Sequence, residues 1–319
     1  MEVLQLCGDE WENPDEGTLL VKVEACGIGL PDLFMTQGRY PIVASPPVHP
    51  GQEVSGRVIS VPPGSAFRVG ERVMGITIYG SGWWRGGLAD YAFVQERKCL
   101  RIPAEMSDEA AAGFVIGFRT AHAALVERVP VTAGERVLIL GGAGSSGAAA
   151  IQLSKALGAE VIAVAGSDEK LRFCETIGAD HVVSYGEEGW PDAVAGATRG
   201  RGVDVIFDPV GGATALAALA TLATRGRIAL VGFASGEWLK LDAQDMVLRN
   251  YSAVGVFSGG FSANEDARAF ADLAEMVERG AINTPLGSVF EFDQTREAIC
   301  SLSRPGPGKT VVRMSSEGK

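Results

Sequence analysis

Hydrophobic positions in the first 110 or so residues fall into short runs that Gly and Pro interrupt. The runs read "TLLVKVEAC", "EVSGRVISV", "RVMGITI" and "LADYAFV". Short β-like runs with frequent turn residues are typical of compact antiparallel sheets. We therefore predict a barrel-like β domain in this part of the chain.

The pattern becomes helical at Ser107 and then alternates between strand and helix. The segment "SDEAAAGFVIGFRTAHAALVE" begins with Ser and acidic residues and keeps apolar residues at helical spacing, which predicts a helix over 107–127. From Arg136, apolar runs alternate with helical stretches; the runs are "RVLIL", "EVIAVA", "HVVSY", "VDVIFD", "RIALVG" and "YSAVGVF". This alternation predicts an α/β fold whose doubly wound parallel sheet is covered by helices on both faces.

The C-terminal tail contains a helix-like segment, "ARAFADLAEMVERG", and a strand-like segment, "KTVVRM". Because the six-stranded sheet is complete without them, we assign the tail to the first domain. The expected domains are therefore residues 1–114 with 259–319, and residues 115–258 between them.

Composition limits the class of protein and its partners. With 46% hydrophobic and 21% charged residues, the chain has the profile of a soluble globular protein. The net charge of −11, without any basic run to offset it, disfavours nucleic acid and anionic membrane surfaces as partners. The N-terminus does not resemble a signal peptide, and no apolar run reaches the roughly 18 residues of a membrane span, so we expect a cytoplasmic protein. The five cysteines form no C-x-x-C motif, which favours reduced thiols acting as small buried apolar side chains.

A glycine-rich loop follows the strand "RVLIL" directly and leads into a helix. In this loop Gly142 permits the tight turn, Gly144 lets the backbone approach a pyrophosphate, and Gly147 allows close packing of helix and strand. Ser145 and Ser146 open the helix, whose free N–H groups and dipole favour a phosphate. The alternative is a purely structural turn, but the repeating strand–helix units favour a dinucleotide site.

The end of the second strand of this sheet indicates which dinucleotide is bound. NAD-binding folds place an Asp or Glu there to hold the ribose 2′-hydroxyl, whereas this chain has Gly166 and Ser167, with Lys170 one turn later. An uncharged strand end beside a cation suits a 2′-phosphate, so we predict NADPH. Asp168 and Glu169 are ordinary first-turn residues that could instead reach the ribose.

Several motifs together resemble a known family. They are "VKVEACGIGLPDLFMTQGRYP", "HPGQEVSGRVISV", "GGLADYAFV", "FRTAHAALVE", "VLILGGAGSSGAAAIQLSKALGAEVIAVAGSDEKL" and "RGVDVIFDPVGG". In this order and spacing they resemble the medium-chain dehydrogenases/reductases, and more closely their zinc-independent, ζ-crystallin-like quinone oxidoreductases. The resemblance implies a Rossmann doubly wound parallel sheet together with a GroES-like β-barrel domain, which the C-terminal tail completes.

The metal ligands of zinc-dependent relatives are missing. Where those relatives carry Cys and His, this chain has Gly29 and Gln52. Its three histidines, His49, His122 and His181, show no ligand spacing with Cys or carboxylates. We predict no metal site, with His49 a polar turn residue.

The resemblance, combined with the absence of a Lewis acid, implies hydride transfer from NADPH to a conjugated acceptor. The leading hypothesis is an NADPH:quinone reductase that accepts a quinone or an enone. An enoyl-thioester reductase with Tyr40 of "QGRYP" as proton donor is a second hypothesis, and an NADPH-binding structural, crystallin-like protein is a third. Tyr40 alternatively packs the rim of the cleft.

Other site residues are carried over from the family. Thr120 is expected near the nicotinamide, Tyr185 with Ser167 and Lys170 near the 2′-phosphate, and Phe257 and Lys309 along the cofactor cleft. The alternatives are a plain helix residue for Thr120, a strand cap for Tyr185, a core side chain for Phe257 and a solvated charge for Lys309. The aromatic residues Tyr79, Trp83 and Trp84 are candidates for an apolar lid.

Two departures from the family and one assembly prediction complete the sequence analysis. Quinone oxidoreductases commonly have Asn where this chain has Gly29 or Leu30, which alters the nicotinamide end of the site. Relatives also begin with an extra strand, so the first hairpin is incomplete here or the start lies further upstream. The run "YSAVGVF" is expected to be a long apolar sheet edge, and relatives pair such edges, so we predict a homodimer.

Overall fold

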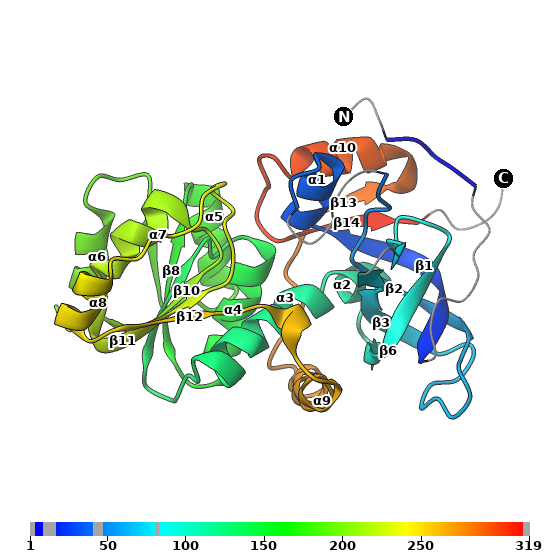
Figure 1. Ribbon diagram of the computed structural model, residues 1–319, viewed down its shortest axis with the longest axis horizontal. Coiled ribbons are helices and arrows are strands. Elements are labelled where there is room, and N and C mark those ends of the chain that lie inside the picture. The colour runs from blue at the N-terminus through cyan, green and yellow to red at the C-terminus, as the bar shows by residue number, and fades with distance from the viewer. Residues whose placement is uncertain (1–3, 9–16, 41–46, 81–82, 315–319) are drawn as a thin grey trace. The chain divides into compact units, whose positions relative to one another are not determined.

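The computed structural model describes residues 4–40 except 9–16, and residues 47–314 except 81–82. The chain forms two compact units (Figure 1). The first comprises Met1–Ile116, Ala263–Ala274 and Leu286–Lys319, and the second comprises Gly117–Ser262 and Glu275–Pro285. Residues 259–262 and 275–285, which we expected in the first domain, therefore group with the second unit, and residues 115–116 group with the first.

The first unit is built on a β-barrel. Its strands are β1 (Thr18–Ile28), β2 (Glu53–Ser60), β3 (Arg72–Thr77), β6 (Tyr91–Arg101), β13 (Leu286–Glu291) and β14 (Lys309–Arg313), in the order β13-β14-β1-β2-β3-β6. Because β6 pairs with both β3 and β1, four of these strands close into a barrel. The strand predicted from "KTVVRM" is β14, which pairs antiparallel with β1. Along each barrel strand, every second side chain points into the barrel, as Val21 of β1, Val54 of β2 and Val94 of β6 do.

Short helices and turns complete the first unit. They are α1 (Leu30–Thr36), α2 (Asp108–Ala112), η3 (Phe292–Gln294), α10 (Thr295–Ser301) and the two-residue strands β4 (Tyr79–Gly80) and β5 (Trp83–Trp84). The side chains of Tyr79, Trp83 and Trp84 lie outside the described residues, so the predicted aromatic lid is not described. Helix α9 (Ala263–Glu278) contributes residues to both units.

The second unit confirms the predicted doubly wound parallel sheet. Its strands are β7 (Arg136–Leu140), β8 (Glu160–Ala165), β9 (His181–Ser184), β10 (Val203–Asp208), β11 (Leu222–Leu230) and β12 (Ser252–Gly255). They run parallel in the order β12-β11-β10-β7-β8-β9, which is the strand order of dinucleotide-binding folds. The run "YSAVGVF" is an edge, as expected, but β12 has only four residues and is not the long edge that we predicted.

Helices cover both faces of this sheet. The helices and helical turns between β6 and α9, apart from α2, are α3 (Val115–His122), the π-helix η1 (Ala123–Arg128), α4 (Ser145–Ala156), α5 (Asp168–Thr176), α6 (Trp190–Ala197), α7 (Gly212–Leu219), α8 (Ala243–Arg249) and the 3₁₀ turn η2 (Ser258–Gly260). Residues of α6 and α7 share a core with Leu138 and Ile162. Residue Ala163, which alternates with Ile162, faces α4 and α5 instead. The sheet is therefore the middle of three layers.

Two sequence predictions need correction. The helix expected over 107–127 is three elements, because α2 ends at Gly113 and a second helix, α3, begins at Val115 before widening into η1. All five cysteines are free, but Cys7 is exposed and Cys300 half-buried, so only Cys26, Cys99 and Cys174 are the buried apolar side chains we expected. In the described part of the chain no helix has the length and apolarity of a membrane span.

Candidate active site

The glycine-rich loop joins β7 to α4 at the carboxyl edge of the parallel sheet. The residue with positive φ is Gly141, at +60°, so the tight turn that we assigned to Gly142 lies one position earlier. A Cβ on Gly142 would meet Ala163 Cβ at 3.0 Å, which makes Gly142 a packing residue. A Cβ on Gly147 would lie 2.3 Å from the carbonyl oxygen of Gly141. The loop thus depends on glycine for its turn and for the close contact of helix and strand.

The N-terminus of α4 presents unpaired amides. Gly144 is its N-cap, and no side chain caps the helix there. The N–H groups of Ser145, Ser146 and Gly147 lie in the first turn, where a helix offers no acceptor, whereas the N–H of Ala148 already donates to Gly144 O at 2.8 Å. The residues present fit a dinucleotide, because the free amides and the helix dipole suit an anionic pyrophosphate.

The end of β8 brings together three residues predicted for the 2′-phosphate. Ser167 is the N-cap of α5, and its hydroxyl accepts a hydrogen bond from the backbone N–H of Lys170 at 3.4 Å. A Cβ on Gly166 would lie 2.6 Å from Tyr185 Oη, so the phenol covers the backbone of Gly166. Tyr185 therefore contacts the turn after β8, and its role is not limited to capping the strand β9.

Lys170 is the cation at this turn that an anionic ligand can contact. Lys170 forms no ion pair with any described residue, so its ammonium group is free for a ligand. Asp168 and Glu169 are exposed in the first turn of α5, where acidic side chains stabilise a helix. The strand end itself carries no carboxylate.

The segment after β12 holds two more predicted residues. Thr120 Oγ1 on α3 donates to Ser258 Oγ at 3.4 Å, so Thr120 is more than a plain helix residue. Phe257 is 55% exposed, and the alternative of a core side chain is therefore wrong. Its ring lies over the backbone of Gly259, where a Cβ would be 2.6 Å away.

Tyr40 lies in a separate cluster in the first unit. Burial raises the pKa of the Tyr40 phenol above its usual value, the neighbouring Gln52 lowers it, and the charge of Asp32 raises it again. The phenol is therefore protonated at neutral pH and able to donate a proton. Its neighbours Gln52 and Asp32 are both buried.

Asp32 holds the backbone of this cluster together. Its carboxylate accepts hydrogen bonds from the N–H of Gly51 at 2.7 Å and the N–H of Gly29 at 2.8 Å. Burial raises its pKa from 3.8 to about 6, although these two N–H groups and Lys309 act in the opposite direction. Asp32 thus ties the start of α1 to the segment that carries Gln52.

Lys309 forms a buried ion pair. Its Nζ lies 2.5 Å from Glu53 Oε1, and both side chains are at least 95% buried. The second oxygen of Glu53 accepts a hydrogen bond from the N–H of Ile116 at 2.8 Å. The alternative of a solvated charge at Lys309 is therefore wrong. The sequence singled out neither Asp32 nor Glu53, because their partners Gly51 and Lys309 lie far along the chain and no local pattern marks them.

The side chains at the family's zinc positions do not fit zinc. Gly29 has no ligand atom, and a Cβ there would lie 4.0 Å from the ammonium of Lys309, a poor neighbour for a divalent cation. Burial raises the pKa of the Cys26 thiol well above its usual value, which disfavours the thiolate that binds metal. His49 Nε2 lies 2.8 Å from Arg85 Nη1 and is engaged there. Among the described residues, no three His, Cys, Asp or Glu side chains form a metal-binding group.

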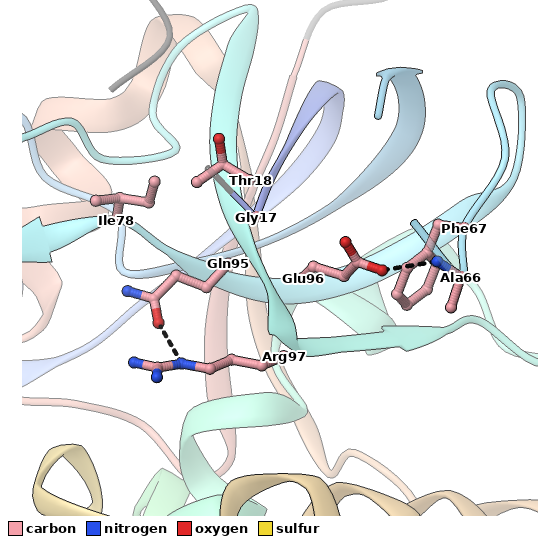
Figure 2. A pocket seen from close by; sticks show the side chains of 8 residues that line it. All are labelled: Gly17, Thr18, Ala66, Phe67, Ile78, Gln95, Glu96 and Arg97. Carbon is pink, nitrogen blue, oxygen red and sulfur yellow. Dashed lines mark hydrogen bonds between the residues drawn. The ribbon is translucent and has the colours of Figure 1, made fainter. Parts of the chain in front are cut away.

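A pocket in the first unit lies apart from these residues (Figure 2). It has a volume of about 920 Å³ and is lined by Gly17, Thr18, Ala66, Phe67, Ile78, Gln95, Glu96 and Arg97. The carboxylate of Glu96 accepts from the N–H of Ala66 at 2.8 Å, and Arg97 Nε donates to Gln95 Oε1 at 3.4 Å. Its polar groups therefore hold the local loop, and none of the predicted site residues lines it.

Comparisons with known proteins match this arrangement over nearly the whole chain. Residues 15–104 match the alcohol dehydrogenase GroES-like domain, and residues 147–276 match the zinc-binding dehydrogenase domain. The chain is 32% identical to quinone oxidoreductase-like protein 2 of Bos taurus, over 92% of this chain and 84% of that protein.

Two solved structures also match nearly the whole chain. A mycobacterial protein complexed with NADPH is 30% identical, with a TM-score of 0.87 over 98% of this chain and 96% of that one. A quinone oxidoreductase of Pseudomonas syringae is 26% identical, with a TM-score of 0.86 over 98% and 96% of the two chains.

Proposed function

Because this chain belongs to the quinone oxidoreductase-like family of the medium-chain dehydrogenases/reductases, we propose that it reduces a quinone or another conjugated carbonyl compound with NADPH. NADPH supplies the hydride from C4 of its nicotinamide when bound. The protein binds and orients the two reactants and supplies a proton.

One observation carries the proposal: the second unit combines a glycine cradle with a strand end that has no carboxylate of its own and is followed by Ser167 and Lys170. The free amides of Ser145–Gly147 receive the pyrophosphate, and Ser167 with Lys170 receives the 2′-phosphate. An NADH-dependent enzyme would be expected to place a carboxylate at this strand end. The NADPH bound to the mycobacterial relative agrees with this choice.

The acceptor class follows from the side chains at the metal positions. Gly29 has no side-chain ligand, Gln52 offers an amide where zinc-dependent relatives have an imidazole, and Lys309 lies beside Gly29. The chain then polarises a carbonyl only through hydrogen bonds, which are weaker than a metal ion in this role. Electron-poor conjugated acceptors need less polarisation than a simple ketone, and they are therefore the proposed substrates.

Tyr40 is the proposed proton donor. A phenol is protonated at neutral pH, and burial together with the Asp32 carboxylate raises the pKa of Tyr40 further, so the proton is present for transfer. An enone requires a proton at carbon or oxygen after hydride arrives, and a positioned phenol can deliver it.

The experiment that tests the acceptor class is a panel of initial rates with saturating NADPH. The acceptors are 1,4-benzoquinone, 9,10-phenanthrenequinone, an enone, crotonyl-CoA and a simple ketone, each with and without a zinc chelator. We expect turnover with the quinones and the enone that the chelator leaves unchanged. Faster turnover of crotonyl-CoA would instead favour an enoyl-thioester reductase, and loss of activity with the chelator would contradict zinc independence.

A homodimer is the proposed assembly. Strand β12 forms one edge of the sheet, pairing with β11 on one side. Exposed strand edges are usually covered, and a second copy of the same edge can cover this one.

A further inference from the structure

Residues 255–261 run from the last residue of β12 to Phe261 and have little regular structure of their own. This segment contains three glycines, Gly255, Gly259 and Gly260, and the three-residue turn η2. Phe257 is exposed, and its ring lies over the backbone of Gly259 in the same loop. A segment of this kind needs outside contacts to keep one conformation.

Helix α3 and its continuation η1 supply those contacts. Thr120 donates to Ser258 Oγ at 3.4 Å, and Arg128 Nε donates to the carbonyl oxygen of Gly255 at 3.2 Å. At the far end of the segment, the guanidinium of Arg119 lies over the ring of Phe261, 4.5 Å from its centroid. The segment is therefore held at three points by one helical element.

Arg119 is itself fixed from the other side. Its side chain is 99% buried, and Nη1 donates to Glu127 Oε2 at 2.8 Å. Glu127 belongs to the π-helix η1. Helices of this type are rare in proteins, and those that occur often lie at functional sites. The histidine His122 also faces this carboxylate, with Nδ1 3.9 Å from Oε2. A buried, paired guanidinium with one face on an aromatic ring has little freedom to move.

The same helix also contacts the glycine-rich loop. A Cβ on Gly117 would lie 3.2 Å from the carbonyl oxygen of Ser145, the first residue of α4. Helix α3 therefore contacts both the pyrophosphate end and the 255–261 segment, and it fixes the distance between them. A dinucleotide that spans these two places needs that distance to be constant.

We propose that Arg119 is a positioning residue of the nucleotide site: through Phe261 and Glu127 it holds residues 257–261 in place for the nicotinamide half of the cofactor. Arg119 does not touch the adenine half, which binds at Ser167 and Lys170. Its effect is therefore confined to ligands that carry the nicotinamide. This inference rests on the proposed NADPH-dependent function.

The test compares NADPH with 2′,5′-ADP, which has the 2′-phosphate and the adenine but no nicotinamide. The variants are Arg119→Lys, which keeps the charge but loses the planar face, Phe261→Leu, and the double variant. Arg249→Lys is the matched control, because Arg249 also lies over an aromatic ring in this unit, 5.3 Å from the centroid of Tyr251. Dissociation constants are measured by titration, and backbone hydrogen exchange is followed in the ligand-free proteins.

Arg119→Lys and Phe261→Leu should each raise the dissociation constant of NADPH about tenfold and that of 2′,5′-ADP less than about twofold. The double variant should be little worse than either single variant, because both remove the same contact. Hydrogen exchange at 257–261 should become faster in both, and Arg249→Lys should leave all three readouts unchanged.

Other outcomes overturn the inference in distinguishable ways. Equal weakening of NADPH and 2′,5′-ADP by Arg119→Lys would indicate general structural damage, and unchanged NADPH binding with unchanged exchange would show that Arg119 positions nothing. If the wild-type protein binds neither compound, the proposed function itself fails and the inference fails with it.

Discussion

The buried charges of this chain each have a defined partner, which explains why they can be buried at all. Asp32 accepts two backbone N–H groups, and Lys309 pairs with Glu53. An unpaired charge in such surroundings would cost several kcal/mol. Burial of these two charges therefore depends on the contacts that hold Asp32 and Lys309 in place.

Asp32 should make the stability of the protein depend on pH in an unusual direction. Its pKa is about 6 in the folded chain, above the ordinary value of 3.8, so the folded state binds the proton more tightly. The resulting stabilisation is present at low pH and is lost as pH rises through about 6. Asp32→Asn, which does not titrate, should therefore destabilise by about 1.4 kcal/mol more at about pH 5 than at about pH 7.5.

Urea unfolding of both proteins at the two pH values measures this difference. Glu109→Gln is a control, because hydrogen bonding to its own backbone lowers the pKa of this partly exposed carboxyl and the sign of its pH effect is opposite. A difference that is equal at both pH values, or larger at the higher one, would contradict a raised pKa at Asp32.

Tyr40→Phe tests the proposed proton donor. The phenol is protonated and partly buried, and the variant removes only its hydroxyl. A general acid contributes about 10² to 10⁴ in rate, so kcat for an enone should fall at least about 10²-fold. Quinone reduction should fall less, since a quinone oxygen can also take its proton from water, and the dissociation constant of NADPH should not change. Equal enone rates for both proteins would show that Tyr40 only packs at this position.

At the scale of elements, the sequence predicted strands better than helices. The boundaries of β7, β8 and β10 agree with the apolar runs residue for residue, because buried parallel strands are apolar on both faces and end where the run ends. The prediction of one helix over 107–127 was wrong because the apolar spacing continues across two changes in the backbone. The first is the end of α2 at Gly113, and the second is the change from α-helix to π-helix at Ala123; hydrophobic periodicity reveals neither.

The sequence did not reveal the side-chain contacts that hold the site, because local patterns do not show which distant residues meet. The glycines, Ser167 and Lys170 are found by local pattern, since they follow a strand at a fixed spacing. The pairs Lys309 with Glu53 and Arg119 with Phe261 join residues far apart in the chain. Only the folded arrangement reveals them.

The glycine-rich loop gives a prediction at this scale. In Gly147→Ala the new Cβ would meet Gly141 O at 2.3 Å, so the start of α4 must shift away from β7. We expect NADPH to bind at least about tenfold more weakly and the free energy of unfolding to fall by about 1–3 kcal/mol. Gly196→Ala in α6 is the matched control, because a Cβ there meets nothing within 4 Å, and it should be neutral or slightly stabilising. Equal NADPH affinity in Gly147→Ala and the wild type would contradict a close-packed cradle.

At the scale of the whole molecule, the two units divide the proposed work. The second unit carries the residues for the nucleotide, and the first carries Tyr40, Asp32 and the ion pair of Lys309. The barrel and the doubly wound sheet are both confirmed. Both could be predicted because the barrel strands are short runs broken by Gly and Pro, whereas the parallel strands are apolar runs that alternate with helices.

The proposed homodimer gives a prediction at this scale. Light scattering should report twice the 33.4 kDa mass of one chain, because a second copy covers the edge of β12. Hydrogen exchange at the outward N–H groups of β12 should then be slow and should accelerate on dilution. A mass of one chain at micromolar concentration would contradict this assembly.

The most direct test of the central claim is the oxidation of NADPH and of NADH, measured side by side with 9,10-phenanthrenequinone as acceptor. The account predicts turnover, with kcat/KM for NADPH at least about tenfold above that for NADH, since Ser167 and Lys170 favour the 2′-phosphate and no carboxylate at the end of β8 favours the free ribose. Equal or greater efficiency with NADH, or no oxidation of either cofactor, would contradict it.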